Sequence, residues 1–177
     1  MRRLAMLVAL VGALVGALIG AGLALPRDHV AASSIALRQP PDTVWAVVRD
    51  LGGVNAWWSE VDEADLVPND VEGREVWRYT MQDRSTMLLV VESADPPKRL
   101  VTRIDAAPGA AFGGAWIYEV DADGQGSKLT VTEDGWIANP FFRVLTHFVF
   151  GYHKTLDSYL AALGRRFGEL TTPVHES

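Results

Sequence analysis

An apolar stripe close to the C-terminus is the strongest hydrophobic pattern in the chain. Between Asn139 and Gly168, apolar residues recur at steps of three and four, the period of one face of a helix. Asn139 followed by Pro140 is typical of a helix start, an N-cap residue before a proline at the first helical position. The pattern predicts one helix of about eight turns, far longer than the usual three. Its apolar face consists of Phe141, Leu145, Phe148, Tyr152, Leu156, Tyr159 and Leu163.

Most segments before this helix have the polar and apolar alternation of half-buried strands. Short helical segments are expected at residues 42–50 and 54–60, and Asp123–Gly126 reads as a hairpin turn. Strands joined by short turns pair antiparallel, and only the last helix is long enough to cover the buried face of their sheet. The sequence therefore predicts an α+β fold. Its strands are expected at residues 29–37, 64–67, 74–81, 85–93, 99–105, 115–121 and 128–134.

The N-terminal segment has a different pattern. From Leu4 to Leu25 no side chain is charged or polar, and as a helix this run would span roughly 33 Å, about one bilayer core. Arg2 and Arg3 precede the run, so the positive-inside rule places the N-terminus in the cytoplasm and the following domain outside it. We predict an N-terminal transmembrane helix, a single-pass anchor in the cell membrane formed by residues 1–26. The alternative is a signal peptide that is cleaved, leaving a secreted or periplasmic domain.

Small residues mark one face of this N-terminal helix. Gly12, Gly16 and Gly20 stand four residues apart, a spacing that allows two membrane helices to pack closely. A homodimer through these glycines is one interpretation. The other is that glycine is simply common in membrane helices.

Composition limits the classes of function. The chain has 177 residues, of which 49% are hydrophobic, which is enough for one globular domain. We place that domain at residues 28–168, followed by a flexible tail at 169–177. Cysteine is absent, which excludes disulfides and thiolate chemistry. The net charge of −6 argues against nucleic acid as a partner, because phosphate binding needs a basic surface.

Inward-facing aromatic residues suggest that the sheet and the helix enclose a ligand cavity. Ligand pockets have largely apolar walls with a few polar groups, and buried Tyr and Trp need partners for their polar atoms. The alternative is a solid core. Phe150 breaks the stripe next to Gly151, so either the helix bends there or an aromatic ring is exposed. The predicted cavity residues are Trp77, Tyr79, Trp116, Tyr118, Trp136, Phe141, Leu145, Phe148 and Tyr152.

Three titratable residues are weak candidates for acid–base catalysis. Glu75 and Glu133 share the predicted inward face of the sheet, and His153 flanks the apolar stripe of the helix. For all three, an ordinary surface or rim role is the competing interpretation. No histidine pair has metal-ligand spacing, and no phosphate-binding or dinucleotide-binding motif occurs, so neither a metal nor a cofactor is predicted.

Residue strings in the same order as these elements resemble the START / Bet v 1-like (SRPBCC) superfamily, especially its polyketide cyclase/dehydrase-like bacterial branch. The first strand ends in PPDTVW (Pro40–Trp45), NAWW (Asn55–Trp58) follows, and TEDGW (Thr132–Trp136) leads into the Asn139–Pro140 helix start. The resemblance covers about residues 30–168. It implies a helix-grip fold, a curved seven-stranded antiparallel sheet around the C-terminal helix, with a cavity between them.

Together these features predict a membrane-tethered, extracytoplasmic domain that binds a hydrophobic small molecule or lipid. The first alternative is a polyketide cyclase- or dehydratase-like enzyme that uses acid–base residues in the cavity, although an enzyme is less favoured than a binding protein. The second alternative is a protein-interaction module. An exposed apolar patch combined with a filled cavity would favour the module.

Overall fold

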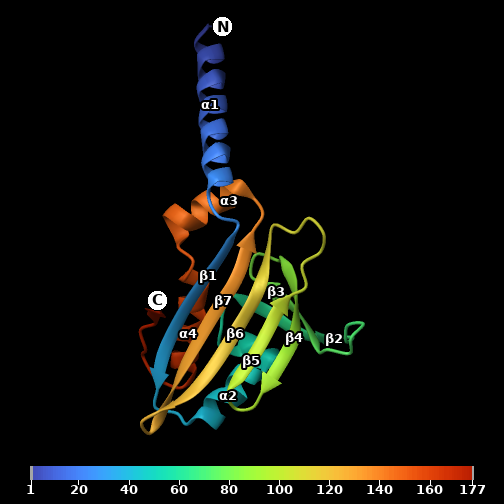
Figure 1. Cartoon of the computed structure of the whole chain (residues 1–177), viewed down its shortest axis with the longest axis vertical. Helices are drawn as coiled ribbons and strands as arrows, with labels where there is room; N and C mark the ends of the chain where they lie inside the picture. Colours follow the sequence, from blue (N-terminus) through green and yellow to red (C-terminus); the bar gives the residue numbers. More distant parts are fainter. Residues whose placement is uncertain (1, 177) are drawn as a thin grey trace.

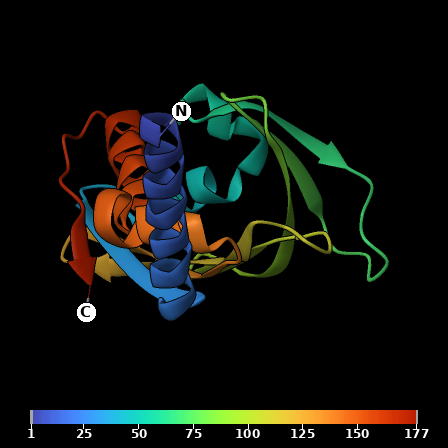
Figure 2. The same cartoon turned by 90° about the horizontal axis from the view of Figure 1, so that it is seen from above.

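The computed structural model describes residues 2–176. A long N-terminal helix is joined to a curved sheet, and the remaining helices lie on one face of that sheet (Figures 1 and 2). Its helical segments are α1 (Arg2–Ala24), α2 (Pro41–Arg49), α3 (Pro140–Leu145) and α4 (Lys154–Arg166), with the 3₁₀-helix η1 (Leu51–Ala56) and the π-helix η2 (Thr146–Phe150). Its strands are β1 (Asp28–Leu37), β2 (Val61–Val67), β3 (Val76–Met81), β4 (Thr86–Asp95), β5 (Arg99–Ile104), β6 (Phe112–Asp123), β7 (Gly126–Ile137) and β8 (Val174–Glu176).

All strands belong to one antiparallel sheet with the order β2-β3-β4-β5-β6-β7-β1-β8. The α+β class and the helix-grip arrangement agree with the prediction, and each predicted strand overlaps an observed one. The predicted count of seven strands is wrong. The eighth strand, β8, lies in the segment 169–177 that was predicted as a flexible tail, and it pairs with residues 32–34 of β1. Three residues with no alternating pattern are too few for sequence periodicity to reveal a strand.

The hairpin of β6 and β7 lies in the interior of the sheet, between β5 and β1. Asp123 pairs with Gly126 across a two-residue turn, as predicted, and Gly124 has a φ of +59°, which glycine adopts without strain. From Ser127 to Val131 of β7 every second residue is buried, including Leu129 and Val131. These residues meet the apolar face of α4, where Leu160 is fully buried, so the core lies between α4 and this part of the sheet.

The prediction of one continuous C-terminal helix is wrong. The segment begins as expected, with Asn139 Oδ1 accepting a hydrogen bond from the backbone N–H of Phe141 at 2.9 Å. It then passes through the π-turn η2 and stops at Gly151, whose φ of +75° is incompatible with a right-handed helix. The helix therefore breaks at Gly151, which agrees with the first interpretation, and Phe150 is 50% exposed, which agrees with the second. Because the break changes which face each residue presents, Phe148 is 70% exposed rather than buried.

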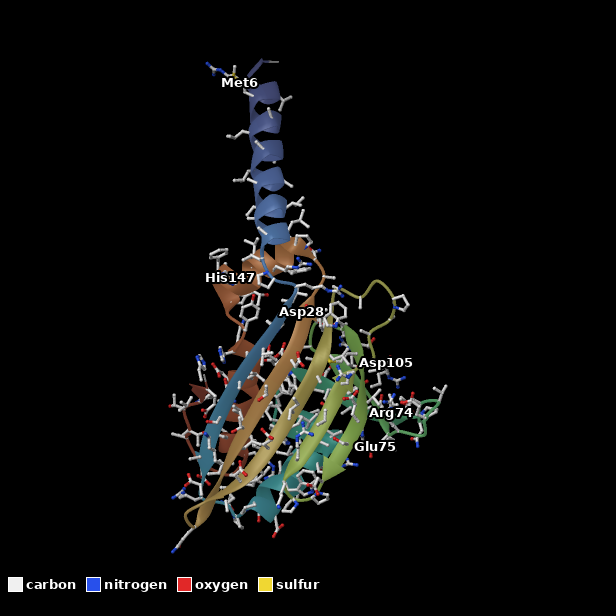
Figure 3. All side chains as sticks on the ribbon, in the orientation of Figure 1. Met6, Asp28, Arg74, Glu75, Asp105 and His147 are labelled. Atoms are coloured by element: carbon white, nitrogen blue, oxygen red, sulfur yellow. The ribbon has the colours of Figure 1, made fainter. Side chains whose placement is uncertain are left out.

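Helix α1 projects from the end of the domain at which α3 lies (Figure 1). Figure 3 shows its side chains pointing outward along its length, with Met6 near the far end and Asp28 just after its base. Within residues 2–176, none of the helices combines the length and the apolar character that crossing a membrane requires. The predicted transmembrane anchor at residues 4–25 is therefore wrong. The single-pass placement, with the N-terminus and the domain on opposite sides of the membrane, was derived from that anchor and is wrong with it.

The last turn of α1 is attached to the domain instead. Arg143 Nη1 of α3 donates to the carbonyl oxygens of Gly22 and Leu25 at 3.5 and 3.4 Å. A Cβ on Gly22 would lie 2.0 Å from the carbonyl oxygen of Pro140, so the two backbones are in close contact. The apolar pattern predicts that this turn lies in the membrane, whereas in the structure it packs against α3.

The glycine face of α1 is open. A Cβ added to Gly12, Gly16 or Gly20 would meet no atom of the described residues within 4 Å. The homodimer through these glycines stays a prediction. Met1 of the predicted anchor and Ser177 of the predicted tail lie outside the described residues.

Candidate functional site: a cavity between sheet and helices

A cavity of about 760 Å³ lies between the sheet and the segment that runs from α3 to the start of α4. Its walls come from β1, from β3 to β7, from the loop after η1, and from α3, η2 and residues 151–155. Cavities that hold small organic ligands have volumes of roughly 300–1,000 Å³. The chain therefore has both a packed core around α4 and a separate space large enough for a ligand.

Aromatic rings close the inner end of this cavity. Tyr159 of α4 is buried, and its ring centroid lies 5.3 Å from Trp58, 5.6 Å from Trp116 and 5.7 Å from Tyr118. These edge-to-face contacts hold the three lining rings in fixed orientations. Burial raises the pKa of Tyr118 and of Tyr159, so both hydroxyls stay protonated and neutral. The inner end is thus apolar and uncharged.

One polar pair stands on the wall of the cavity. His29 Nε2 lies 3.1 Å from Glu133 Oε1, and Trp116 Nε1 donates to Glu133 Oε2 at 3.1 Å. Because an ionised carboxylate only accepts hydrogen bonds, Nε2 is the protonated ring nitrogen in this contact. The His29 ring also stacks on Tyr152 with 4.5 Å between centroids. The Glu133 side chain keeps 24% of its surface accessible, so its remaining lone pairs can meet a ligand.

Two glycines make room for the rings beside this pair. Gly135 lies opposite His29 in the β1–β7 register, and a Cβ there would come within 3.0 Å of the imidazole. Gly113 lies opposite Trp136 in the β6–β7 register, and a Cβ there would come within 2.7 Å of the indole. At Gly113 the contact is closer than side-chain atoms tolerate, so the indole would have to shift, whereas at Gly135 the imidazole would have to give by a few tenths of an ångström.

The other two catalytic candidates lie elsewhere. Arg49 donates to both oxygens of Glu75, and this hydrogen bonding lowers the pKa of the Glu75 carboxyl. His153 Nδ1 lies 3.1 Å from Ser33 Oγ, and its ring stacks on His175 at 3.8 Å. Neither Glu75 nor His153 is among the residues that line the cavity. Of the three candidates, only Glu133 reaches it.

Five of the nine predicted cavity residues line the cavity, and four do not. Trp77 packs over Gly52 of η1, where a Cβ would lie 2.7 Å from its ring. Phe141, Leu145 and Phe148 precede the break at Gly151, and the stripe that would have turned them inward does not continue through it. Their predicted placement is wrong for this reason. The five that line the cavity are Tyr79, Trp116, Tyr118, Trp136 and Tyr152, and their role in binding stays a prediction.

Several lining residues were missed by the sequence reasoning. His29 is the second residue of its strand, and its partner Glu133 is 104 residues away, so only the β1–β7 register brings them together. Trp58 lies in a loop without periodicity. Phe142 and Phe150 line the cavity because the helix breaks. The anomaly at Phe150, next to a glycine, was the one signal that could have found these two.

Within residues 2–176, no three His, Asp or Glu side chains lie close enough together to hold a metal ion. The prediction of no metal and no cofactor stays a prediction.

Comparison with known proteins identifies the family. Residues 28–167 match the family model described as "Polyketide cyclase / dehydrase and lipid transport". The chain belongs to this family. Together with structural neighbours named for the START superfamily and for an Ara h 8 allergen, this match confirms the predicted SRPBCC superfamily. No curated protein matches the chain.

Solved structures share the fold at low sequence identity. A START superfamily protein from Mycobacterium smegmatis is 17% identical, with a TM-score of 0.61, over 78% of this chain and 96% of that one. The XoxI protein from Bacillus cereus is 16% identical, with a TM-score of 0.61, over 80% and 96%. Ara h 8.0201 is 14% identical, with a TM-score of 0.57, over 80% and 99%. These likenesses establish the fold and nothing finer.

Proposed function

We propose that this chain binds a hydrophobic small molecule or a lipid in the cavity between the sheet and the helices. The observation that carries the proposal is the pocket of about 760 Å³, half open to solvent, with largely aromatic and apolar walls. Protein interiors are close-packed, and the side chains around an empty space lose dispersion contacts. A bound apolar ligand would restore these dispersion contacts, which in a solid core the neighbouring side chains provide.

The family supports the same class of function. Family and fold suggest a domain that binds hydrophobic ligands or resembles polyketide cyclases, and the family description includes lipid transport. The two kinds of activity share the same requirement, an enclosed apolar site. The proposal does not include tethering to a membrane.

An enzyme is the second candidate function, and the His29–Glu133 pair favours it. Two titratable groups within 3.1 Å of each other on a cavity wall could move a proton to or from a bound substrate. Glu75 and His153 do not join them, because neither lines the cavity. Tyr79 does line it, but its hydroxyl hydrogen is donated to the carbonyl of Leu51. The protein-interaction module is less favoured, because it was expected to have a filled cavity.

Native mass spectrometry of the purified full chain tests the proposal. After incubation with a mixed lipid extract, the chain should carry one apolar molecule. A chain that remains unbound under these conditions would overturn the proposed function. If the released molecule differs chemically from the one added, the enzyme is favoured instead. The Glu133→Gln variant should then bind the molecule and leave it unchanged.

A further inference from the structure

Carboxylates on the cavity wall are held by ring and hydroxyl donors. Glu133 accepts hydrogen bonds from His29 Nε2 and Trp116 Nε1, and Glu60 accepts one from Ser158 Oγ at 2.5 Å. Within residues 2–176, neither carboxylate forms an ion pair with arginine or lysine. Hydrogen bonds from such donors orient a carboxylate but leave its negative charge uncompensated, unless the imidazole is protonated.

A third lining carboxylate, Asp83, is held in the same way. It accepts hydrogen bonds from the backbone N–H and the hydroxyl of Ser85, at 2.9 and 2.6 Å. It lies at the exposed rim of the cavity, in the turn between β3 and β4. The cavity wall therefore has three carboxylates, of which Glu60 and Glu133 are partly buried.

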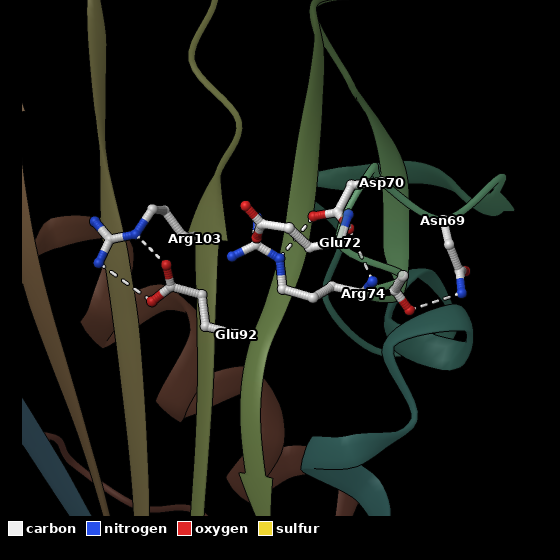
Figure 4. A network of polar contacts seen from close by, with 7 residues as sticks. Asn69, Asp70, Glu72, Arg74, Glu92 and Arg103 are labelled. Carbon is white, nitrogen blue, oxygen red and sulfur yellow. Dashed lines mark hydrogen bonds and ion pairs between the residues drawn. The ribbon is translucent and has the colours of Figure 1, made fainter.

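Carboxylates outside the cavity are paired differently. On the strands β3 to β5 and the loop before them, Arg103 pairs with Glu92 and Arg74 pairs with Asp70 (Figure 4). Arg49 pairs with Glu75 beside η1. These three carboxylates each have an arginine partner, whereas Glu60, Asp83 and Glu133 of the lining have none within the described part of the chain.

Cations near the cavity are already engaged or exposed. Arg143 donates to the carbonyl oxygens of Ile137 and Ala138 at 2.7 and 3.0 Å, in addition to its contacts with α1. Arg27 lies over the ring of Trp136, 4.6 Å from its centroid. Lys154, the one lysine in the lining, is exposed, with Nζ 5.1 Å from the centroid of Phe150. A charge in water is strongly screened, so Lys154 compensates little of the charge deeper in the cavity.

We propose that the cavity accepts an apolar molecule with a protonated amine at its polar end, and that it disfavours carboxylates and phosphates. An ammonium group would supply a positive charge and hydrogen-bond donors to whichever of Glu133 and Glu60 it approaches. The faces of Trp58 and Trp116 also attract cations. An anion would instead meet like charges there. This inference rests on the proposed function and specifies its ligand.

A matched series of ligands tests the charge preference. Dodecylamine, 1-dodecanol and dodecanoate share one chain length and differ in the polar end, so each should displace a neutral apolar dye such as N-phenyl-1-naphthylamine from the full chain. We expect dodecylamine to bind at least tenfold more tightly than dodecanoate at neutral pH, with 1-dodecanol between them. Dodecanoate binding as tightly as dodecylamine, or more tightly, would overturn the inference.

Charge-removing variants locate the effect. Glu133→Gln and Glu60→Gln should each reduce the preference for dodecylamine over dodecanoate severalfold, while 1-dodecanol binding changes less. Glu119→Gln is the matched control, because Glu119 lies on the same strand as Trp116 but is exposed outside the cavity. An unchanged preference in the folded Glu60→Gln variant would count against the inference even if Glu133→Gln does not fold.

Different results of the dye experiment would refute this inference and the proposed function. If the dye does not bind the wild-type chain at all, the proposed function is wrong. If the dye binds and the three ligands displace it equally, the cavity binds apolar molecules without charge selection. Only the present inference would then be wrong.

Discussion

Shortening Phe148 tests the break in the C-terminal helix. A continuous helix would bury this ring against the sheet, where a Phe→Ala substitution costs about 3–5 kcal/mol. In the structure Phe148 is 70% exposed, so less than a third of its surface is removed from water. Scaling the core value by that fraction gives a loss of about 1–1.5 kcal/mol for Phe148→Ala.

Leu160→Ala provides the internal comparison. Leu160 is fully buried on α4, beyond the break, and its truncation should cost about 2–5 kcal/mol. Urea unfolding of the full chain, followed by circular dichroism, measures both variants, and the free energies are comparable if the slope with denaturant is unchanged. A loss of about 3 kcal/mol or more for Phe148→Ala would mean that the ring is buried and the helix continues through Gly151.

Three further predictions follow from individual contacts. Gly151→Ala should destabilise the chain by about 1–2 kcal/mol, since its φ of +75° strains any L-residue, and urea unfolding would show no loss if the helix is continuous. Burial, and then the neighbouring His175, lower the pKa of His153 below its usual 6.5, so its contribution to stability is present above that pH and is lost as the pH falls below it. Thermal unfolding should therefore show a loss of stability on acidification that His153→Gln reduces, and an unchanged pH dependence in this variant would contradict the assignment. Gly113→Ala should displace the indole of Trp136, whose ring is 2.7 Å from the added Cβ, and should weaken binding of a neutral apolar dye. Unaltered dye affinity would show that Trp136 does not shape the site.

The positions of the strands along the chain could be predicted, because they depend on local patterns. Alternation along the strands and the turn at Asp123–Gly126 are visible within a few residues, and the observed sheet reproduces them. The short strand β8 could not be predicted, because three residues that cover an edge of the sheet leave no periodic signal. The position of α1 also depends on tertiary contacts, which Arg143 and Pro140 make with its last turn.

The cavity was harder to predict than the sheet. Tyr79, Trp116 and Tyr118 were found because they lie on strands, where the side chains alternate strictly between the two faces. The cavity residues on the helical segment were misassigned. The positive φ of Gly151 breaks the helix, so the residues before it do not face the sheet as a continuous helix would place them. The pair of His29 and Glu133 depends on the register of β1 against β7, which no local pattern encodes.

Blocking the cavity from one strand is the most direct test of the central claim that it holds an apolar ligand. On β4, Leu89 lines the cavity, whereas the neighbouring Leu88 does not, because successive side chains of a strand point to opposite faces. We predict that the full-length wild type and Leu88→Trp bind N-phenyl-1-naphthylamine saturably in a fluorescence titration, and that Leu89→Trp, which adds an indole inside the cavity, binds it at least tenfold more weakly. Equal binding by the two folded variants, or no binding by the wild type, would contradict the account.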